Sequence, residues 1–190
     1  MSRDIWFFSD HHFSHANILN FTDSNTGILV RPDFENVEHM DECMVETWNA
    51  DIKPGDLVWH GGDITFDKKR FTEKILNRLH GKLRITVGNH DDIKFLASLG
   101  RIEKLVESRR FDEFGFVYSH RPMHPEGMWN HRQNRFMVSA HGHIHQNPSP
   151  AGLYINVSVE ATNYKPIHIE DLTARAKTLY ENWVLMNEHP

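Results

Sequence analysis

In the first half of the chain, the hydrophobic residues switch between two spacings. Short unbroken apolar runs, typical of buried strands, occupy residues 5–9, 56–59 and 83–87. Between and after these runs, apolar residues recur every three or four positions, as on one face of a helix. The helical stretches cover residues 37–48, 67–79 and 93–99. The pattern predicts strands that alternate with helices.

The second half of the chain is richer in strands. Its apolar runs are separated by loops that leave little room for helices until the C-terminal part. The runs occupy residues 114–119, 136–140, 153–159 and 167–169, and the last helix is expected over 172–183. We therefore expect mixed sheets covered by helices, in one α/β domain that spans residues 1–190.

Composition excludes several classes of protein. The chain is 39% hydrophobic and 25% charged, which is ordinary for a soluble globular protein. A net charge of −5 does not favour a generic nucleic-acid or membrane surface. One cysteine, Cys43, and an N-terminus without a signal-peptide pattern lead us to expect a cytoplasmic protein. The unusual number is 15 histidines, because histidine is the commonest metal ligand.

Polar residues of the metal-ligand type follow five of the apolar runs directly. Asp10 and His12 follow the first run, and we expect their side chains to point the same way, as residues two apart do in an extended segment. In open α/β sheets, the edge formed by the strand ends is where sites assemble. The full set is Asp10, His12, Asp63, Asn89, His120, His143 and His145.

The chemistry of this set points to divalent transition metals, which accept mixed oxygen and imidazole ligands. Seven ligands are too many for one tetrahedral ion and fit two ions that share a bridging carboxylate. Paired ions roughly 3.5–4 Å apart are suited to in-line displacement at phosphorus.

The same residues carry a resemblance to a known family. The motifs Asp10-x-His12, Gly62-Asp63, Gly88-Asn89-His90-Asp91, His120 and Gly142-His143-x-His145 resemble the calcineurin-like metallophosphoesterase superfamily. The wider sequence is similar to its small phage and bacterial members. The resemblance covers residues 10–145 and implies a four-layer αββα sandwich with two mixed β-sheets and the site on one edge.

The resemblance also implies a role for each residue. One ion would take Asp10, His12, Asp63 and His145. The other would take Asp63, Asn89, His120 and His143, so that Asp63 bridges the two. His90 would donate a proton without binding metal, and Asp91 would hold it. The expected cofactors are two divalent metal ions, with Mn²⁺ favoured and Fe, Zn, Ni or Mg as alternatives.

Two further features leave alternatives open. Arg121 directly follows His120 and is expected to hold a phosphate oxygen, the alternative being a salt bridge to a nearby acid. The loop of residues 121–135 could form a wall of the cleft, with Trp129 stacking on a base, or serve as a hydrophobic anchor. His15 could touch substrate, although a bracing role in its loop is favoured.

The predicted function is a dinuclear metal-dependent phosphoesterase, favoured as a phosphodiesterase of nucleotide-like or cyclic nucleotide substrates acting through a metal-bridging hydroxide. The sequence GGDITFDKKR stands where the protein phosphatase branch has GDxxDRG, which disfavours a phosphoprotein substrate. The alternatives are a phosphomonoesterase or protein phosphatase, a nuclease, and a non-catalytic scaffold that retains the metal site. The expected partner is a small phosphoester or nucleotide, with nucleic acid less favoured and no membrane.

Overall fold

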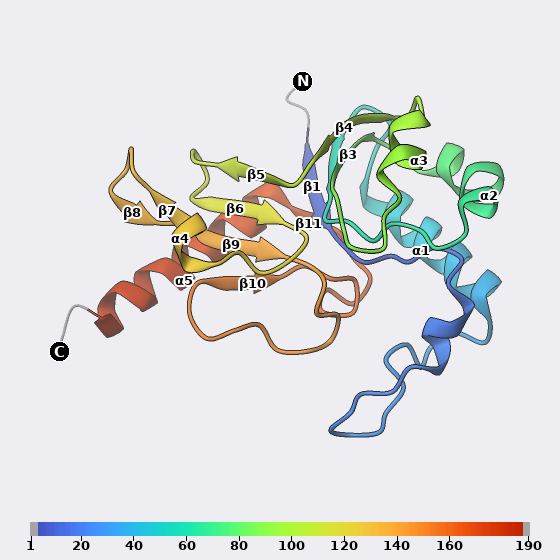
Figure 1. The fold of residues 1–190 in the computed structure, drawn as a ribbon, viewed down its shortest axis with the longest axis horizontal. Coiled ribbons are helices and arrows are strands. Elements are labelled where there is room, and N and C mark those ends of the chain that lie inside the picture. The colour runs from blue at the N-terminus through green and yellow to red at the C-terminus, as the bar shows by residue number, and fades with distance from the viewer. Residues whose placement is uncertain (1–3, 188–190) are drawn as a thin grey trace.

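Two β-sheets form the centre of the protein, whose computed structural model describes residues 4–187 (Figure 1). The larger sheet has the strand order β11-β1-β2-β3-β4. Its strands from β1 to β4 run parallel, and β11 is antiparallel to β1. Their bounds are β1 Ile5–Phe8, β2 Leu57–His60, β3 Lys82–Thr86, β4 Ile102–Val106 and β11 Ile167–His168.

The smaller sheet has the order β10-β9-β6-β5. Strands β6, β9 and β10 are parallel, and β5 is antiparallel to β6. The bounds are β5 Ser108–Phe111, β6 Phe116–Ser119, β9 Val138–His141 and β10 Tyr154–Asn156. A separate hairpin pairs β7, Trp129–Asn130, with β8, Arg135–Phe136.

Helices cover the sheets. The helix α1 begins after Asn36, whose side chain accepts a hydrogen bond from the backbone N–H of His39 at 2.8 Å and so caps the helix. The α-helices are α1 Val37–Asp51, α2 Lys68–Arg70, α3 Ile93–Ser98, α4 Pro125–Met128 and α5 Ile169–Asn187. A 3-10 turn, η1, covers Ala16–Asn20; α2 continues as a π-helical turn, η2 Phe71–Ile75, and a 3-10 turn, η3 Leu76–Arg78.

One hydrophobic core lies between the larger sheet and the helical elements α1, η2, η3 and α3. Met40, Met44 and Trp48 from α1 pack there against Phe8 of β1 and Ile85 of β3. These side chains are at most 1% exposed. Met40, Met44 and Trp48 are four residues apart and so share one face of the helix, which explains why the helix could be predicted from the sequence.

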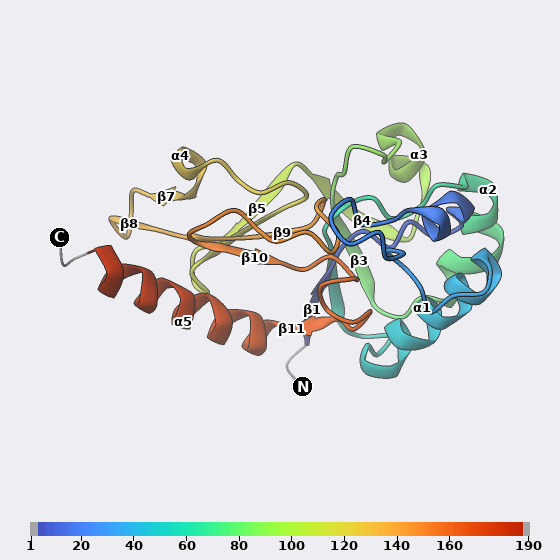
Figure 2. The same cartoon turned by 90° about the horizontal axis from the view of Figure 1, so that it is seen from below.

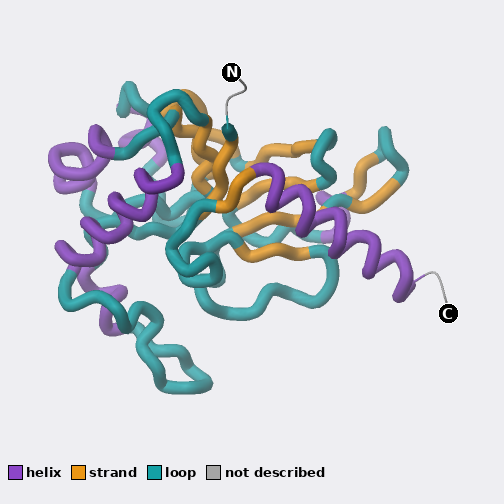
Figure 3. The backbone as a smooth tube through the Cα atoms, turned by 180° about the vertical axis from the view of Figure 1, so that it is seen from behind, coloured by secondary structure: helices purple, strands orange, loops and turns teal. Residues whose placement is uncertain are grey.

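A second core lies between the two sheets and extends to α5. Phe7 of β1 meets Phe116 and Tyr118 of β6 edge to face, with ring centroids 5.6 and 5.2 Å apart. Leu172 and Ala176 of α5 belong to the same core. Figure 2 shows α5 along one face of the smaller sheet. Figure 3, which views the protein from behind, shows α5 crossing the strands.

The α/β class is confirmed, and several details of the prediction are corrected. Strands β4 and β5 were not predicted, and the helix expected over 67–79 is divided among α2, η2 and η3. The segment 121–135, expected as a loop, contains α4 and the β7–β8 hairpin, and α5 begins earlier and ends later than predicted. Among residues 4–187, no helix has the length and apolar character that a bilayer crossing requires.

Candidate metal centre

Both sheets deliver the C-terminal ends of their parallel strands to one edge. The loops after β1, β2 and β3 meet there with the loops after β6 and β9. Backbone hydrogen bonds join these loops. The N–H of Asp10 donates to the carbonyl oxygen of Gly62 at 3.1 Å, and the N–H of Gly142 donates to the carbonyl oxygen of His120 at 2.9 Å. The edge expected from the sequence is therefore the place where the polar residues gather.

The backbone at this edge is held in an unusual conformation. Positive φ angles occur at five predicted ligands, namely Asp10 (62°), His12 (48°), Asp63 (53°), His143 (72°) and His145 (52°). Such values cost of order 1–3 kcal/mol each for non-glycine residues and cluster at functional sites. Asp10 and His12 do lie at one site, but the explanation from an extended segment is wrong. Left-handed turns, and not an extended backbone, direct the two side chains.

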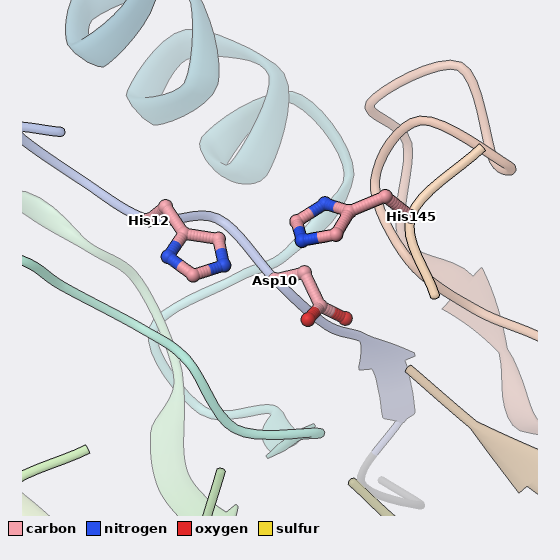
Figure 4. Close-up of side chains that lie close together, drawn as sticks. All are labelled: Asp10, His12 and His145. Atoms are coloured by element: carbon pink, nitrogen blue, oxygen red, sulfur yellow. The ribbon is translucent and has the colours of Figure 1, made fainter. Parts of the chain in front are cut away.

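Asp10, His12 and His145 form the first candidate ion site (Figure 4). One ligand atom of each lies within 4.8 Å of the others, and the two rings and the carboxylate point toward one another. Both ring nitrogens of His12 are buried without a hydrogen-bond partner among the described residues. Burial also holds the pKa of His12 far below its ordinary value, so the ring is neutral, as a metal ligand must be. An ion bound here would give the buried, neutral imidazole of His12 the partner that it lacks among the described residues.

Asp63, His120 and His143 form the second candidate ion site, with ligand atoms again within 4.8 Å. Nδ1 of His120 lies 2.9 Å from the carbonyl oxygen of Gly61, which assigns the proton to Nδ1 and leaves Nε2 free to bind metal. That Nε2 lies 2.8 Å from Oδ1 of Asn89 and 3.1 Å from Nδ1 of His143. Burial lowers the pKa of His143 to about 4, so this ring is also neutral near pH 7.

The Asp63 carboxylate lies between the two sites. Its Oδ2 is 3.6 Å from Nε2 of His12 and 3.4 Å from Nε2 of His120. Each of those nitrogens belongs to a different candidate site, so a single carboxylate oxygen faces both. The donor set and the orphaned nitrogens fit two divalent ions with Asp63 between them.

Close approach of the backbone explains two glycines. A Cβ at Gly88 would collide with the Asp63 carboxylate, and a Cβ at Gly142 would collide with Oδ2 of Asp10 and Oγ of Ser9. The missing side chain at Gly88 therefore leaves room for the carboxylate of Asp63, a predicted metal ligand. The N–H of His143, which follows Gly142, then donates to Oδ2 of Asp10 at 2.9 Å.

His90 lies at the mouth of the site. Its exposed ring is 5.6 Å from the ring of His12, centroid to centroid, and it belongs to neither triad. Its backbone N–H donates to Oδ1 of Asp63 at 2.8 Å. The prediction that Asp91 holds the His90 ring is corrected. The Asp91 carboxylate instead accepts from the N–H groups of Asp63, Ile64 and Gly88 at 2.8–3.0 Å, which fixes the loops that carry Asp63 and Asn89.

Arg121 lines a cavity of about 320 Å³ beside the second candidate site, together with Asn89 and His120. Its exposed side chain is therefore placed where a phosphate substituent could reach it. Trp129, by contrast, packs edge to face on Phe136 with centroids 4.8 Å apart. Of the two alternatives for Trp129, stacking on a base and hydrophobic anchoring, this contact supports the hydrophobic anchor.

Sequence reasoning missed a buried ion pair beneath the first site. The Arg31 guanidinium, 1% exposed, donates to the carbonyl oxygens of Asp10 (2.6 Å) and His11 (2.8 Å). It also pairs with Oε1 of Glu160 at 2.7 Å, and that oxygen lies 2.9 Å from Nδ1 of His145. Burial raises the pKa of Glu160, but Arg31 and His145 outweigh it and hold the value at about 2.

This arrangement makes Glu160 and Arg31 positioning residues. The hydrogen bonds from Arg31 to the carbonyl oxygens of Asp10 and His11 stabilise the left-handed turn that carries Asp10 and His12. Glu160 accepts a hydrogen bond from Nδ1–H of His145 and so directs Nε2 toward the candidate ion site. A lone arginine in a loop and a lone glutamate 129 residues later give no local pattern that sequence reading could have used.

Glu160→Gln is expected to weaken the first ion site by about 10- to 100-fold while leaving the second site intact, as loss of an outer partner of a ligand does. Competition with a chelator, followed by metal analysis, measures the affinity of each site. Glu181→Gln, on the exposed surface of α5, is the matched control. Equal weakening of both sites, or a lower melting temperature without loss of metal affinity, would contradict the positioning role.

Comparison with known proteins places the chain in a family without assigning it an activity. No protein-family model matches the sequence. The uncharacterized protein MJ1445 of Methanocaldococcus jannaschii is 30% identical over 177 residues, which cover 88% of each chain. The chain belongs to the same family as this archaeal protein.

One solved structure shows a similar fold. A protein of unknown function, AQ665 from Aquifex aeolicus, superposes with a TM-score of 0.66 and 23% identity over 92% of this chain and 100% of its own. A conserved uncharacterized protein of Streptococcus pneumoniae, described as a predicted phosphoesterase, reaches a TM-score of 0.36 and 13% identity over 83% of this chain and 72% of its own. That second likeness is too low to carry an argument.

Proposed function

We propose that this protein is a dinuclear metal-dependent phosphoesterase of the calcineurin-like superfamily, acting on phosphodiesters. The observation that carries the proposal is the Asp63 carboxylate, whose Oδ2 lies 3.4 and 3.6 Å from imidazole nitrogens of two separate triads. Zinc, manganese, iron, nickel and magnesium all accept such ligands, with manganese favoured.

The proposed architecture is one domain with the layer order helix–sheet–sheet–helix. The two hydrophobic cores support it, because one joins α1, η2, η3 and α3 with the larger sheet and the other joins the two sheets with α5. In this arrangement the metal edge stays free of the helical layers.

When bound, two divalent ions would polarise the phosphoryl group and supply a nucleophile near neutral pH. The residues of the chain do the rest. Asp10, His12, Asp63, Asn89, His120, His143 and His145 hold the ions. Arg121 binds a phosphate oxygen at the cavity beside Asn89. His90, exposed at the mouth and free of both triads, donates the proton that the leaving oxygen requires.

Open surroundings on two sides of the centre support a preference for diesters. The cavity of about 320 Å³ lies beside the second triad, and the exposed ring of His90 lies near His12 of the first. A diester has two substituents and can fill both sides, whereas a monoester leaves one empty. A nuclease and a phosphomonoesterase use the same metal chemistry and remain the alternatives.

With Mn²⁺ added, kcat/KM for bis(p-nitrophenyl) phosphate is expected to exceed that for p-nitrophenyl phosphate. Initial rates of both substrates, measured on one preparation with and without EDTA, provide the comparison. The reverse order would identify a monoesterase, and EDTA-resistant hydrolysis of both would remove the metal-dependent function itself.

A further inference from the structure

An aromatic shelf lies beside the first candidate ion site. Phe66 stacks on His15 with ring centroids 4.0 Å apart and 15° between the planes. Phe21 meets the same histidine edge to face at 5.7 Å. Despite these contacts, Phe66 is 54% exposed and Phe21 is 49% exposed. Because one face of the Phe66 ring lies against His15, its exposure belongs to the other face and the outer edge.

The shelf is fixed in place by the metal loops. The backbone N–H of Phe66 donates to the carbonyl oxygen of Phe13 at 2.9 Å. Phe13 in turn follows His12, and Phe66 lies three residues after Asp63. The main chain at Phe66 is therefore fixed to the segments that carry two predicted ligands, and the stack on His15 holds the ring.

The shelf also lies on the side of the site where His90 stands. The His90 ring is 5.6 Å from the His12 ring and 6.3 Å from the Phe66 ring. The His90 ring is thus near both an ion ligand and the Phe66 ring. In the proposed reaction His90 protonates the leaving oxygen, so a group attached to that oxygen is within reach of Phe66.

We infer that Phe66 and His15 form a binding subsite for a nucleobase, carried by the leaving nucleoside of a phosphodiester substrate. This inference rests on the proposed phosphodiesterase function. Phe66 and His15 already form a stack of two nearly parallel rings, and a flat ligand ring can extend this stack on the exposed face of Phe66. A ribose supplies the spacer between an ester oxygen beside His90 and a base over Phe66, and base stacking on an aromatic side chain tolerates any base.

Binding provides a test that does not depend on turnover. Adenosine, which contains no phosphoester, is titrated into the zinc-loaded full-length protein, and the base protons are followed by NMR. Stacking on Phe66 should shift these protons upfield. We expect the shift to vanish in Phe66→Ala and to persist in Phe66→Tyr. It should also persist in the control Leu185→Ala, which removes an apolar side chain of similar exposure, 63%, from α5. An unchanged shift in Phe66→Ala would overturn the subsite.

Kinetics test the position of the base. Phe66→Ala should lower kcat/KM for a dinucleoside phosphate by about 10- to 100-fold, the range that loss of one stacked base produces. It should leave unchanged the rate for the analogue that lacks the base of the leaving nucleoside. Equal losses on both substrates would overturn the assignment. If the wild-type protein hydrolysed no diester but bound adenosine through Phe66, the proposed function would fail while the aromatic subsite would stand.

Discussion

Asp63→Asn is expected to lower activity by more than about 100-fold and to reduce the metal content of both sites together. In the proposed centre, the carboxylate oxygen that faces His12 and His120 would serve both ions, so removing its charge should weaken two sites with one substitution. Loss of an outer partner of a ligand already costs about 10- to 100-fold in affinity or activity, and Asp63 is itself a shared ligand.

Elemental analysis and anomalous scattering measure the number and position of the ions in this variant and in the parent protein. Asp51→Asn, an exposed change of the same chemistry at the end of α1, is the matched control, and His39→Ala tests a half-buried histidine of α1 that belongs to neither candidate ion site. Both controls should keep two ions and full activity. A well-loaded parent protein with a single ion remote from Asp63 would contradict the dinuclear centre.

The elements that the sequence predicted are those buried on a regular period. The α1 stripe of Met40, Met44 and Trp48 was readable because all three face one core. Strand β4 was missed because it is the edge strand of its sheet, and its residues Ile102–Val106 alternate imperfectly, with Glu103 and Lys104 both exposed. An edge strand lies against a neighbour on one side only, and its sequence carries a weaker signal.

The candidate site shows the same division between local and distant information. The predicted ligands were readable because each follows an apolar run, and the structure brings them to one edge in two triads with Asn89 beside the second. The Arg31–Glu160 pair was not readable, because its geometry depends on two loops far apart in the chain. The role of Asp91 also required coordinates, since its partners are backbone N–H groups, which any residue can offer.

His90→Ala should affect substrates according to how poor their leaving group is. General acid catalysis contributes about 10²- to 10⁴-fold when the leaving oxygen needs a proton. A p-nitrophenolate leaves readily, so bis(p-nitrophenyl) phosphate should lose little. A nucleoside oxygen has a much higher pKa, so a dinucleoside phosphate should lose the full factor. Parallel measurement of kcat/KM on the two substrates gives the comparison.

The structure supplies a reason why this variant should keep its metals. The contact between residue 90 and the Asp63 carboxylate is made by the backbone N–H, which donates to Oδ1 at 2.8 Å, and alanine retains that group. His131→Ala, an exposed histidine on the loop between β7 and β8, should change neither substrate and serves as the control. Loss of an ion in His90→Ala would make His90 a ligand. Equal losses on both substrates with both ions retained would mean that His90 positions the phosphate, and the proton would then have to come from water or from another residue.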